Sequence, residues 1–155
     1  MSGVLFYWLL FYEHRALSAV LRTMKLDKLD HLVLPVSDID RIAEFYTKNL
    51  GMDKRTFGDG RVALHFGDQK INLHPAGWDY EPKAAVSIAG SADLCFIAVE
   101  SVEAIRLVLE ESGIDIIEGP IRRTGAIGEL CSIYFRDPDG NLIELSNRIP
   151  RDQLD

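Results

Sequence analysis

The sequence predicts an α+β fold built from two copies of one module, in which a strand and a helix precede three further strands. Two observations lead to this prediction. An apolar run followed by an amphipathic segment occurs twice, from His31 to Gly51 and from Asp93 to Gly113, with the same spacing in both places. Short apolar runs separated by turn residues then follow each amphipathic segment. We therefore expect one domain of paired βαβββ modules over residues 24–150.

The first module is expected over about residues 29–75. A helix is predicted from Ser37 to Leu50, because apolar side chains recur there every three or four residues. Ser37 is its predicted N-cap, and Gly51 marks its end. The turn sequences GDG and GD separate the strands that follow. The strands of this module are predicted at residues 31–36, 52–57, 61–66 and 69–74.

The second module is expected over about residues 92–147. Its helix is predicted at residues 102–112, with Ser101 as the N-cap and Gly113 as the end. The sequence DPDG forms the last hairpin turn. The strands of this module are predicted at residues 93–99, 114–118, 129–135 and 141–146. The remaining long segments are predicted to be loops, at residues 75–91 and 119–128.

Composition narrows the class of protein. The chain has 155 residues and a net charge of -7, which argues against nucleic-acid binding and disfavours an anionic membrane surface as a partner. Cys95 and Cys131 lie in apolar strand-like runs, as buried free thiols do. A disulfide framework is not indicated, so a reducing cytoplasm is the expected location.

Residues 1–23 do not fit the module pattern. The segment Val4–Tyr12 is an unbroken apolar run, but it is shorter than the roughly 20 residues that span a bilayer. It also lacks the charged start and the cleavage site of a signal peptide. Three interpretations remain open: a weak membrane anchor, a helix docked on the domain, or upstream sequence translated in error before a natural start at Met24.

Four ionisable residues interrupt the apolar strands, namely His31, His74, Asp93 and Glu144. Burying such groups is costly unless something pairs with them, and imidazoles and carboxylates are the ligands that divalent metals recruit. We align Asp93 with His31 on the first strands, and Glu144 with His74 on the last strands. This pattern predicts one metal site, and the alternative is four unrelated polar residues with separate hydrogen-bond partners.

The motif FRDPDGNLIEL at residues 135–145, together with Asp30-His31 and the sequence NLGM at residues 49–52, resembles the vicinal oxygen chelate superfamily. That family includes glyoxalase I, fosfomycin-resistance enzymes and extradiol dioxygenases, and the resemblance covers about residues 24–148. It implies curved mixed sheets around a metal cleft, with ligands at His31, His74 and Glu144. It also implies a homodimer, whose modules pair within or between chains.

The resemblance places a ligand at the position of Asp93 in four-ligand members. Asp93 therefore either binds the metal or orients its ligands. The metal remains open among Fe, Mn, Zn, Ni and Mg. The expected substrate is a small molecule with vicinal oxygens, acted on by a glyoxalase-like lyase or isomerase or by an extradiol-type dioxygenase. Glu144 or Asp93 is the expected general base. Val33 stands where fosfomycin transferases carry a threonine, which counts against that activity.

Further residues are predicted to contact substrate. The resemblance to fosfomycin-resistance enzymes gives this role to Tyr134, and Ser132 shares its strand face by alternation. Arg122 and Arg123 are predicted to clamp an anionic group from the long connection before that strand. Asn72 shares a strand face with His74. The alternative for Tyr134 is a strand residue that only packs, and for the arginines a solvated loop pair.

Two rival hypotheses remain. One is a non-catalytic small-molecule or drug-binding protein of the bleomycin-resistance type, against which the retained His31, His74 and Glu144 argue. The other is a membrane-tethered form of the same protein, which depends only on residues 4–12.

Overall fold

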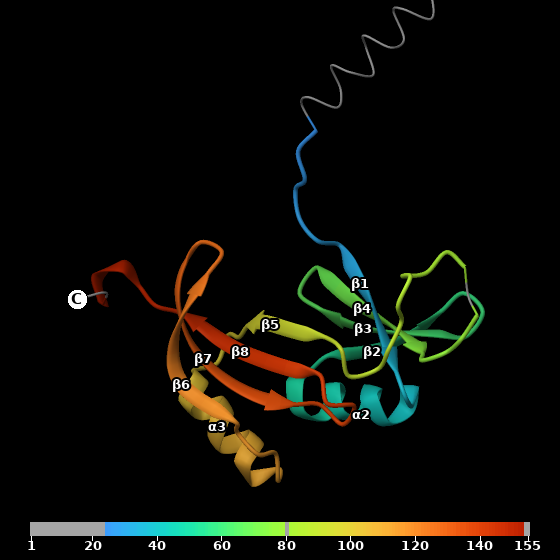
Figure 1. Cartoon of the computed structure of the whole chain (residues 1–155). Coiled ribbons are helices and arrows are strands. Elements are labelled where there is room, and N and C mark those ends of the chain that lie inside the picture. Colours follow the sequence, from blue (N-terminus) through green and yellow to red (C-terminus); the bar gives the residue numbers. More distant parts are fainter. Residues whose placement is uncertain (1–23, 80, 154–155) are drawn as a thin grey trace, which may run out of the picture.

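The computed structural model describes residues 24–79 and 81–153. It contains two sheets of four strands, with the strand orders β1-β4-β3-β2 and β5-β8-β7-β6 (Figure 1). Each sheet comes from one module, and in each the first strand runs parallel to the last while the other neighbours are antiparallel. The predicted pair of βαβββ modules is therefore confirmed. The expectations for residues 1–23 lie outside the described residues.

The first module follows the predicted elements closely. The N-cap of its helix is Asp38, whose side chain accepts a hydrogen bond from the Arg41 backbone N–H at 3.0 Å. The prediction of Ser37 as the cap is therefore wrong by one residue. Gly51 ends the helix at a φ of 64°, as predicted. The elements are β1 (His31–Val36), α2 (Ile39–Leu50), β2 (Asp53–Phe57), β3 (Arg61–Phe66) and β4 (Gln69–Pro75).

The second module departs from the prediction at one strand. Ser101 caps its helix as expected, accepting from the Ala104 N–H at 3.2 Å. The strand predicted at 114–118 is wrong apart from Glu118, because the next strand occupies most of the segment predicted as a loop at 119–128. The elements are β5 (Asp93–Ile97), α3 (Val102–Glu111), β6 (Glu118–Gly125), β7 (Gly128–Arg136), β8 (Leu142–Arg148) and a short 3-10 helix (Arg151–Gln153).

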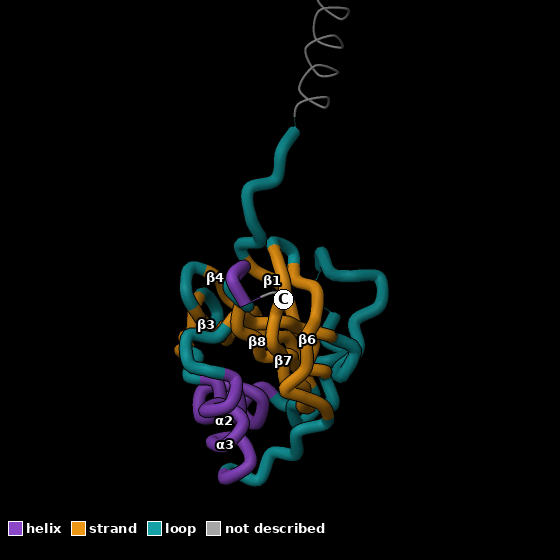
Figure 2. Tube along the Cα trace, turned by 90° about the vertical axis from the view of Figure 1, so that its left-hand side faces the viewer, coloured by secondary structure: helices purple, strands orange, loops and turns teal. Residues whose placement is uncertain are grey.

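Both helices lie on the same side of the molecule (Figures 1 and 2). One apolar core fills the space between them and the sheets, and it draws buried side chains from both modules. Two aromatic contacts join the modules there: Phe45 with Phe135, whose ring centroids are 6.4 Å apart, and Phe66 with Phe96, at 5.2 Å. Burial of this shared apolar surface holds the modules together.

The DPDG turn fastens the second module to the first. Asp137 accepts a hydrogen bond from the Tyr46 hydroxyl at 3.1 Å. Asp139 accepts from the Ser37 backbone N–H at 2.7 Å and forms an ion pair with Arg41 at 2.6 Å. The Asp139 side chain is 2% exposed, so these bonds are largely shielded from water. The motif that carries the family resemblance therefore has a structural role between the modules.

Among the described residues, the helices are too short or too polar to cross a membrane.

Candidate metal and substrate site

Each sheet has one face turned away from the helices, which we call the open face. Alternation along the strands decides which side chains reach it. In β1, Leu34 and Val36 are buried in the core, so His31 lies on the open face. In β4, Ile71 and Leu73 are buried in the core, so Asn72 and His74 lie on the open face. All of the predicted ligands of the first module thus share one surface.

The same alternation places the predicted residues of the second module on its open face. Ile133 and Phe135 of β7 and Ile143 and Leu145 of β8 belong to the core. Ser132 and Tyr134 of β7 therefore face the other way, and Tyr134 lies opposite Glu144 in the register of the two strands. Asp93 is exposed at the start of β5.

Strand register corrects one predicted equivalence. His31 lies opposite Lys70, and Asp93 lies opposite Leu142. If His31 corresponds to Asp93, then Asn72, two residues after Lys70, corresponds to Glu144, two residues after Leu142. The alignment of His74 with Glu144 is therefore wrong. By the same reasoning, His74 corresponds to Ser146.

The predicted ligands do not gather within one chain. Across residues 24–79 and 81–153, no group of three or more His, Cys, Asp or Glu side chains is arranged to hold a metal. His74 lies opposite Pro35, four positions along β1 from His31, which corresponds to about 13 Å. The two imidazoles therefore cannot share an ion inside this sheet. His31 Nδ1 instead lies 2.6 Å from the Asp30 carboxylate.

Glu144 is the best-positioned ionisable group of the site. Its Oε1 atom accepts hydrogen bonds from the hydroxyls of Ser132, at 2.6 Å, and Ser146, at 3.1 Å. Burial works against ionisation, but hydrogen bonds from Ser132, Tyr134, Ser146 and Cys95 outweigh it and hold the pKa of Glu144 below its ordinary value. The carboxylate is therefore ionised at neutral pH and fixed in place.

Tyr134 links this carboxylate to a cation. Arg123 Nε donates to the Tyr134 hydroxyl at 3.1 Å, and Arg123 Nη2 donates to Glu118 at 2.8 Å. Burial and the hydrogen bond to Glu144 raise the pKa of Tyr134 despite the nearby arginine. The phenol therefore keeps its proton at neutral pH and remains a hydrogen-bond donor.

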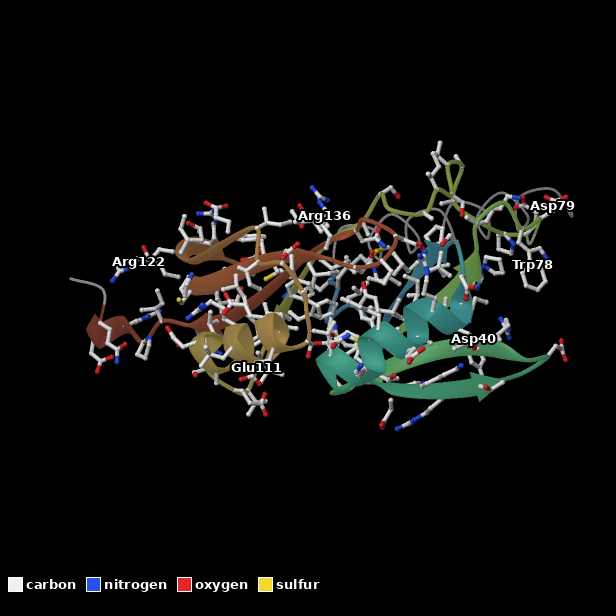
Figure 3. The ribbon with its side chains drawn as sticks, turned by 90° about the horizontal axis from the view of Figure 1, so that it is seen from below. Asp40, Trp78, Asp79, Glu111, Arg122 and Arg136 are labelled. Carbon is white, nitrogen blue, oxygen red and sulfur yellow. The ribbon has the colours of Figure 1, made fainter. Side chains whose placement is uncertain are left out.

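The predicted arginine clamp is only half present. Arg123 lies beside Tyr134, but Arg122 pairs with Cys131 in the register and so occupies the opposite face of the sheet. Its guanidinium donates to the carbonyl of Gln153 at 3.3 Å. Figure 3 shows Arg122 near the chain's C-terminal end, far from Arg136 at the other end of β7. The two arginines belong to a strand, and alternation separates them.

Three contributors to the site were not predicted: Ser146, Cys95 and Glu118. Alternation could have found the first two, because Ser146 is two residues from Glu144 and Cys95 is two residues from Asp93. Cys95 is exposed, contrary to the prediction of a buried thiol, and its sulfur lies 3.6 Å from the Ser146 hydroxyl. Burial of the thiol raises the pKa of Cys95 all the same. No sequence signal marked Glu118.

Asn72 is the clearest sign of an absent ligand in the first sheet. It is 8% exposed, and its Oδ1 atom has no hydrogen-bond partner among the described residues. A buried amide oxygen without a partner is costly. It occupies the position that corresponds to Glu144, and an amide oxygen suits a hard divalent cation. The donor set His31, Asn72, Asp93 and Glu144 therefore fits such an ion.

The structure also has a groove of about 770 Å³ between the modules. It is lined mainly by apolar side chains of α2, β5 and α3, and of the predicted or newly found site residues only Cys95 borders it. The groove is therefore distinct from the open faces that carry the candidate ligands.

Paired βαβββ modules with ionisable side chains on their open faces define an α+β protein of the glyoxalase fold class. Residues 28–145 match the model of the Glyoxalase/Bleomycin resistance protein/Dioxygenase superfamily, and the chain belongs to this family, which is also called the vicinal oxygen chelate superfamily.

Curated relatives cover most of the domain. The chain is 52% identical over 126 residues to glyoxalase domain-containing protein RDO1 of Mycosarcoma maydis, a match that covers 81% of this chain and 71% of that protein. It is equally identical, over the same length, to virulence protein STM3117 of Salmonella typhimurium, covering 81% and 88%. The crystal structure of STM3117 superposes with a TM-score of 0.79 over 81% of this chain and 100% of that chain. Metallothiol transferase FosB of Shouchella clausii is 30% identical over 120 residues, covering 76% and 77%.

Proposed function

We propose that this protein is a divalent-metal-dependent enzyme that acts on a small substrate with adjacent oxygens, as a lyase, isomerase or dioxygenase. The observation that carries the proposal is the Glu144 carboxylate, which is ionised and held on an open sheet face by the Ser132 and Ser146 hydroxyls. Family membership and the name of the relative metallothiol transferase FosB support a metal at this carboxylate.

The proposed ligands are His31, Asp93 and Glu144. Asn72 supplies a fourth oxygen at the position matched to Glu144, and His74 remains a candidate one row farther along the same face. A bound divalent cation would supply Lewis-acid polarisation of the two adjacent substrate oxygens. The exposed Asp93 carboxylate is placed to accept a proton from substrate. The Tyr134 phenol, which is protonated and held by Arg123, is placed to donate a hydrogen bond to a substrate oxygen.

We propose further that two copies of the chain complete each site. The ligand candidates of the two sheets do not meet within one chain, and β1 and β5 each pair on one side only among the described strands. Val33 of β1 and Ile97 of β5 are both 47% exposed, which leaves apolar surface on these free edges. Pairing β1 of one copy with β5 of another would bring His31 to the Asp93 and Glu144 of its partner.

Metal content of the full-length chain, purified anaerobically without an affinity tag, tests the proposal. We expect close to one ion per chain, lost in Glu144→Ala and His31→Ala. His65→Ala is the matched control, because His65 is an imidazole on the same sheet face opposite Lys70. Comparison of Asn72→Ala with His74→Ala identifies the further ligand. A chain that holds no metal after reconstitution would overturn the enzyme proposal and favour a small-molecule-binding protein.

A reducing, cytoplasmic location is part of this proposal. Cys95 and Cys131 are free, and Cys95 is exposed. An exposed thiol remains reduced most readily in the cytoplasm.

A further inference from the structure

Two cations converge on one aromatic ring of the first sheet. The guanidinium carbon of Arg61 lies 4.7 Å from the centre of the Phe57 ring, and Lys70 Nζ lies 4.5 Å from it. The two positive charges are therefore no farther apart than the sum of these distances. Phe57 lies opposite Arg61 in the register of β2 and β3, and Lys70 shares the open face with Asn72.

Neither cation has a carboxylate partner. Among residues 24–79 and 81–153, no Asp or Glu oxygen lies within 4.0 Å of the Arg61 or Lys70 side-chain nitrogens. The carboxylate of Asp30 is held by His31 at 2.6 Å, and that of Asp53 by Arg55 at 3.2 Å. Like charges brought together in this way repel one another unless an anion lies between them.

The surrounding side chains add positive rather than negative charge. His74 and His65 lie on the same face, beside β3 and Lys70 respectively. The charge of Arg61 adds to the effect of burial in lowering the pKa of His74. This basic surface occurs in a chain whose net charge is -7, so it does not follow from overall composition. A local surplus of cations on one sheet face is the arrangement expected for an anion site.

From this geometry we propose that Arg61 and Lys70 bind the oxyanion group of a small molecule, a phosphate, phosphonate or carboxylate. The inference rests on the proposed function and deepens it, because Lys70 lies opposite His31 and two residues from Asn72. A substrate bound at the metal would then place its anionic end on Arg61 and Lys70. Arg61 offers paired N–H donors for such a group, and Lys70 supplies a point charge.

Methylphosphonate and acetate serve as probes, titrated into the full-length, metal-depleted protein at low salt by calorimetry. We expect saturable binding of at least one probe, and comparison of the two distinguishes a phosphonate-like group from a carboxylate. Arg61→Met and Lys70→Gln should each weaken binding, and the double variant by about tenfold or more. Arg55→Met is the matched control, because that arginine lies on the same face and is already paired with Asp53.

Three outcomes would overturn the inference. They are no binding of either probe, equal loss in the Arg55→Met control, and a double variant that weakens dimer formation while leaving probe binding unchanged. The last result would show that Arg61 and Lys70 pair with a second copy of the chain. Thermal melts of each variant establish that the fold is intact.

Glu144→Ala separates the two proposals. If this variant binds the probe like the parent while neither holds metal, the proposed metal enzyme fails and the oxyanion site stands. If the parent holds metal but no probe, only the oxyanion site fails.

Discussion

Ser132 and Glu144 lie on neighbouring strands, and the serine hydroxyl donates to the glutamate Oε1 at 2.6 Å. Ser132 is fully buried, and it also lies 2.8 Å from the hydroxyl of Ser146. A buried pair of hydroxyls thus holds one oxygen of the carboxylate on which the proposed metal site depends. This relationship leads to the first prediction.

Ser132→Ala should raise the pKa of Glu144 towards its ordinary value, because a hydrogen bond to the ionised form is lost. The folded-state pKa of Glu144 is depressed, so its stabilising contribution is present above the unfolded pKa and is lost as the pH falls through the folded pKa. The variant should therefore show a weaker acid-side loss of stability. Carboxyl-carbon NMR titration and denaturant unfolding between neutral and acid pH measure both effects.

The control for this prediction is Ser91→Ala, whose hydroxyl bonds only to the Ile88 carbonyl in a loop. It should leave the Glu144 titration unchanged. An unchanged titration in Ser132→Ala as well would mean that Ser132 does not stabilise the ionised carboxylate.

Asp139→Ala should destabilise the fold by about 2–3 kcal/mol, because the Ser37 N–H and Arg41 lose a buried acceptor. Urea denaturation measures the change. Asp59→Ala is the control, since Asp59 is exposed in the turn before β3, and a change within about 0.5 kcal/mol is expected there. Equal losses in the two variants would contradict a fastening role for the DPDG turn.

Gly119→Ala should cost more stability than Gly51→Ala. Gly119 has a φ of 110°, and a Cβ there would lie 2.3 Å from the Ser132 carbonyl oxygen and 2.8 Å from Ile133 Cα. Gly51 also has a positive φ, but a Cβ there meets nothing within 4 Å, so its variant measures only the conformational cost of about 1–2 kcal/mol. Thermal melts compare the two. Similar losses would show that β6 moves away from β7 without difficulty.

Mixing His31→Ala with Glu144→Ala chains, by unfolding and refolding together, should restore about a quarter of the parent's metal content, because half of the random dimers are mixed and each has one intact site of two. Mixing Asp93→Ala with Glu144→Ala is the control. Both of those residues come from the same module, so no intact site can form. Metal analysis of the refolded mixtures is the measurement. Recovery in neither mixture would contradict a site shared between chains.

Local signals account for most of the predicted elements. Ser101 caps α3, Gly51 ends α2, and the DPDG turn joins β7 to β8, all as expected from short-range chemistry. The strand β6 was missed because it alternates exposed and half-buried residues and includes two arginines, so it presents no continuous apolar run. Its place in the sheet comes from pairing with β7, which is a non-local interaction.

The sequence by itself determined the two βαβββ modules, the family resemblance and the faces of β4 and β8 that carry Asn72, His74 and Glu144, because repeats, turns and two-residue alternation are local properties. Only the tertiary structure decided which of these residues correspond. The register of β1 against β4 and of β5 against β8 matches Asn72, rather than His74, with Glu144. It also separated Arg122 from Arg123 and placed two unpaired cations on Phe57. Register depends on contacts between strands distant in sequence, which alternation alone does not encode.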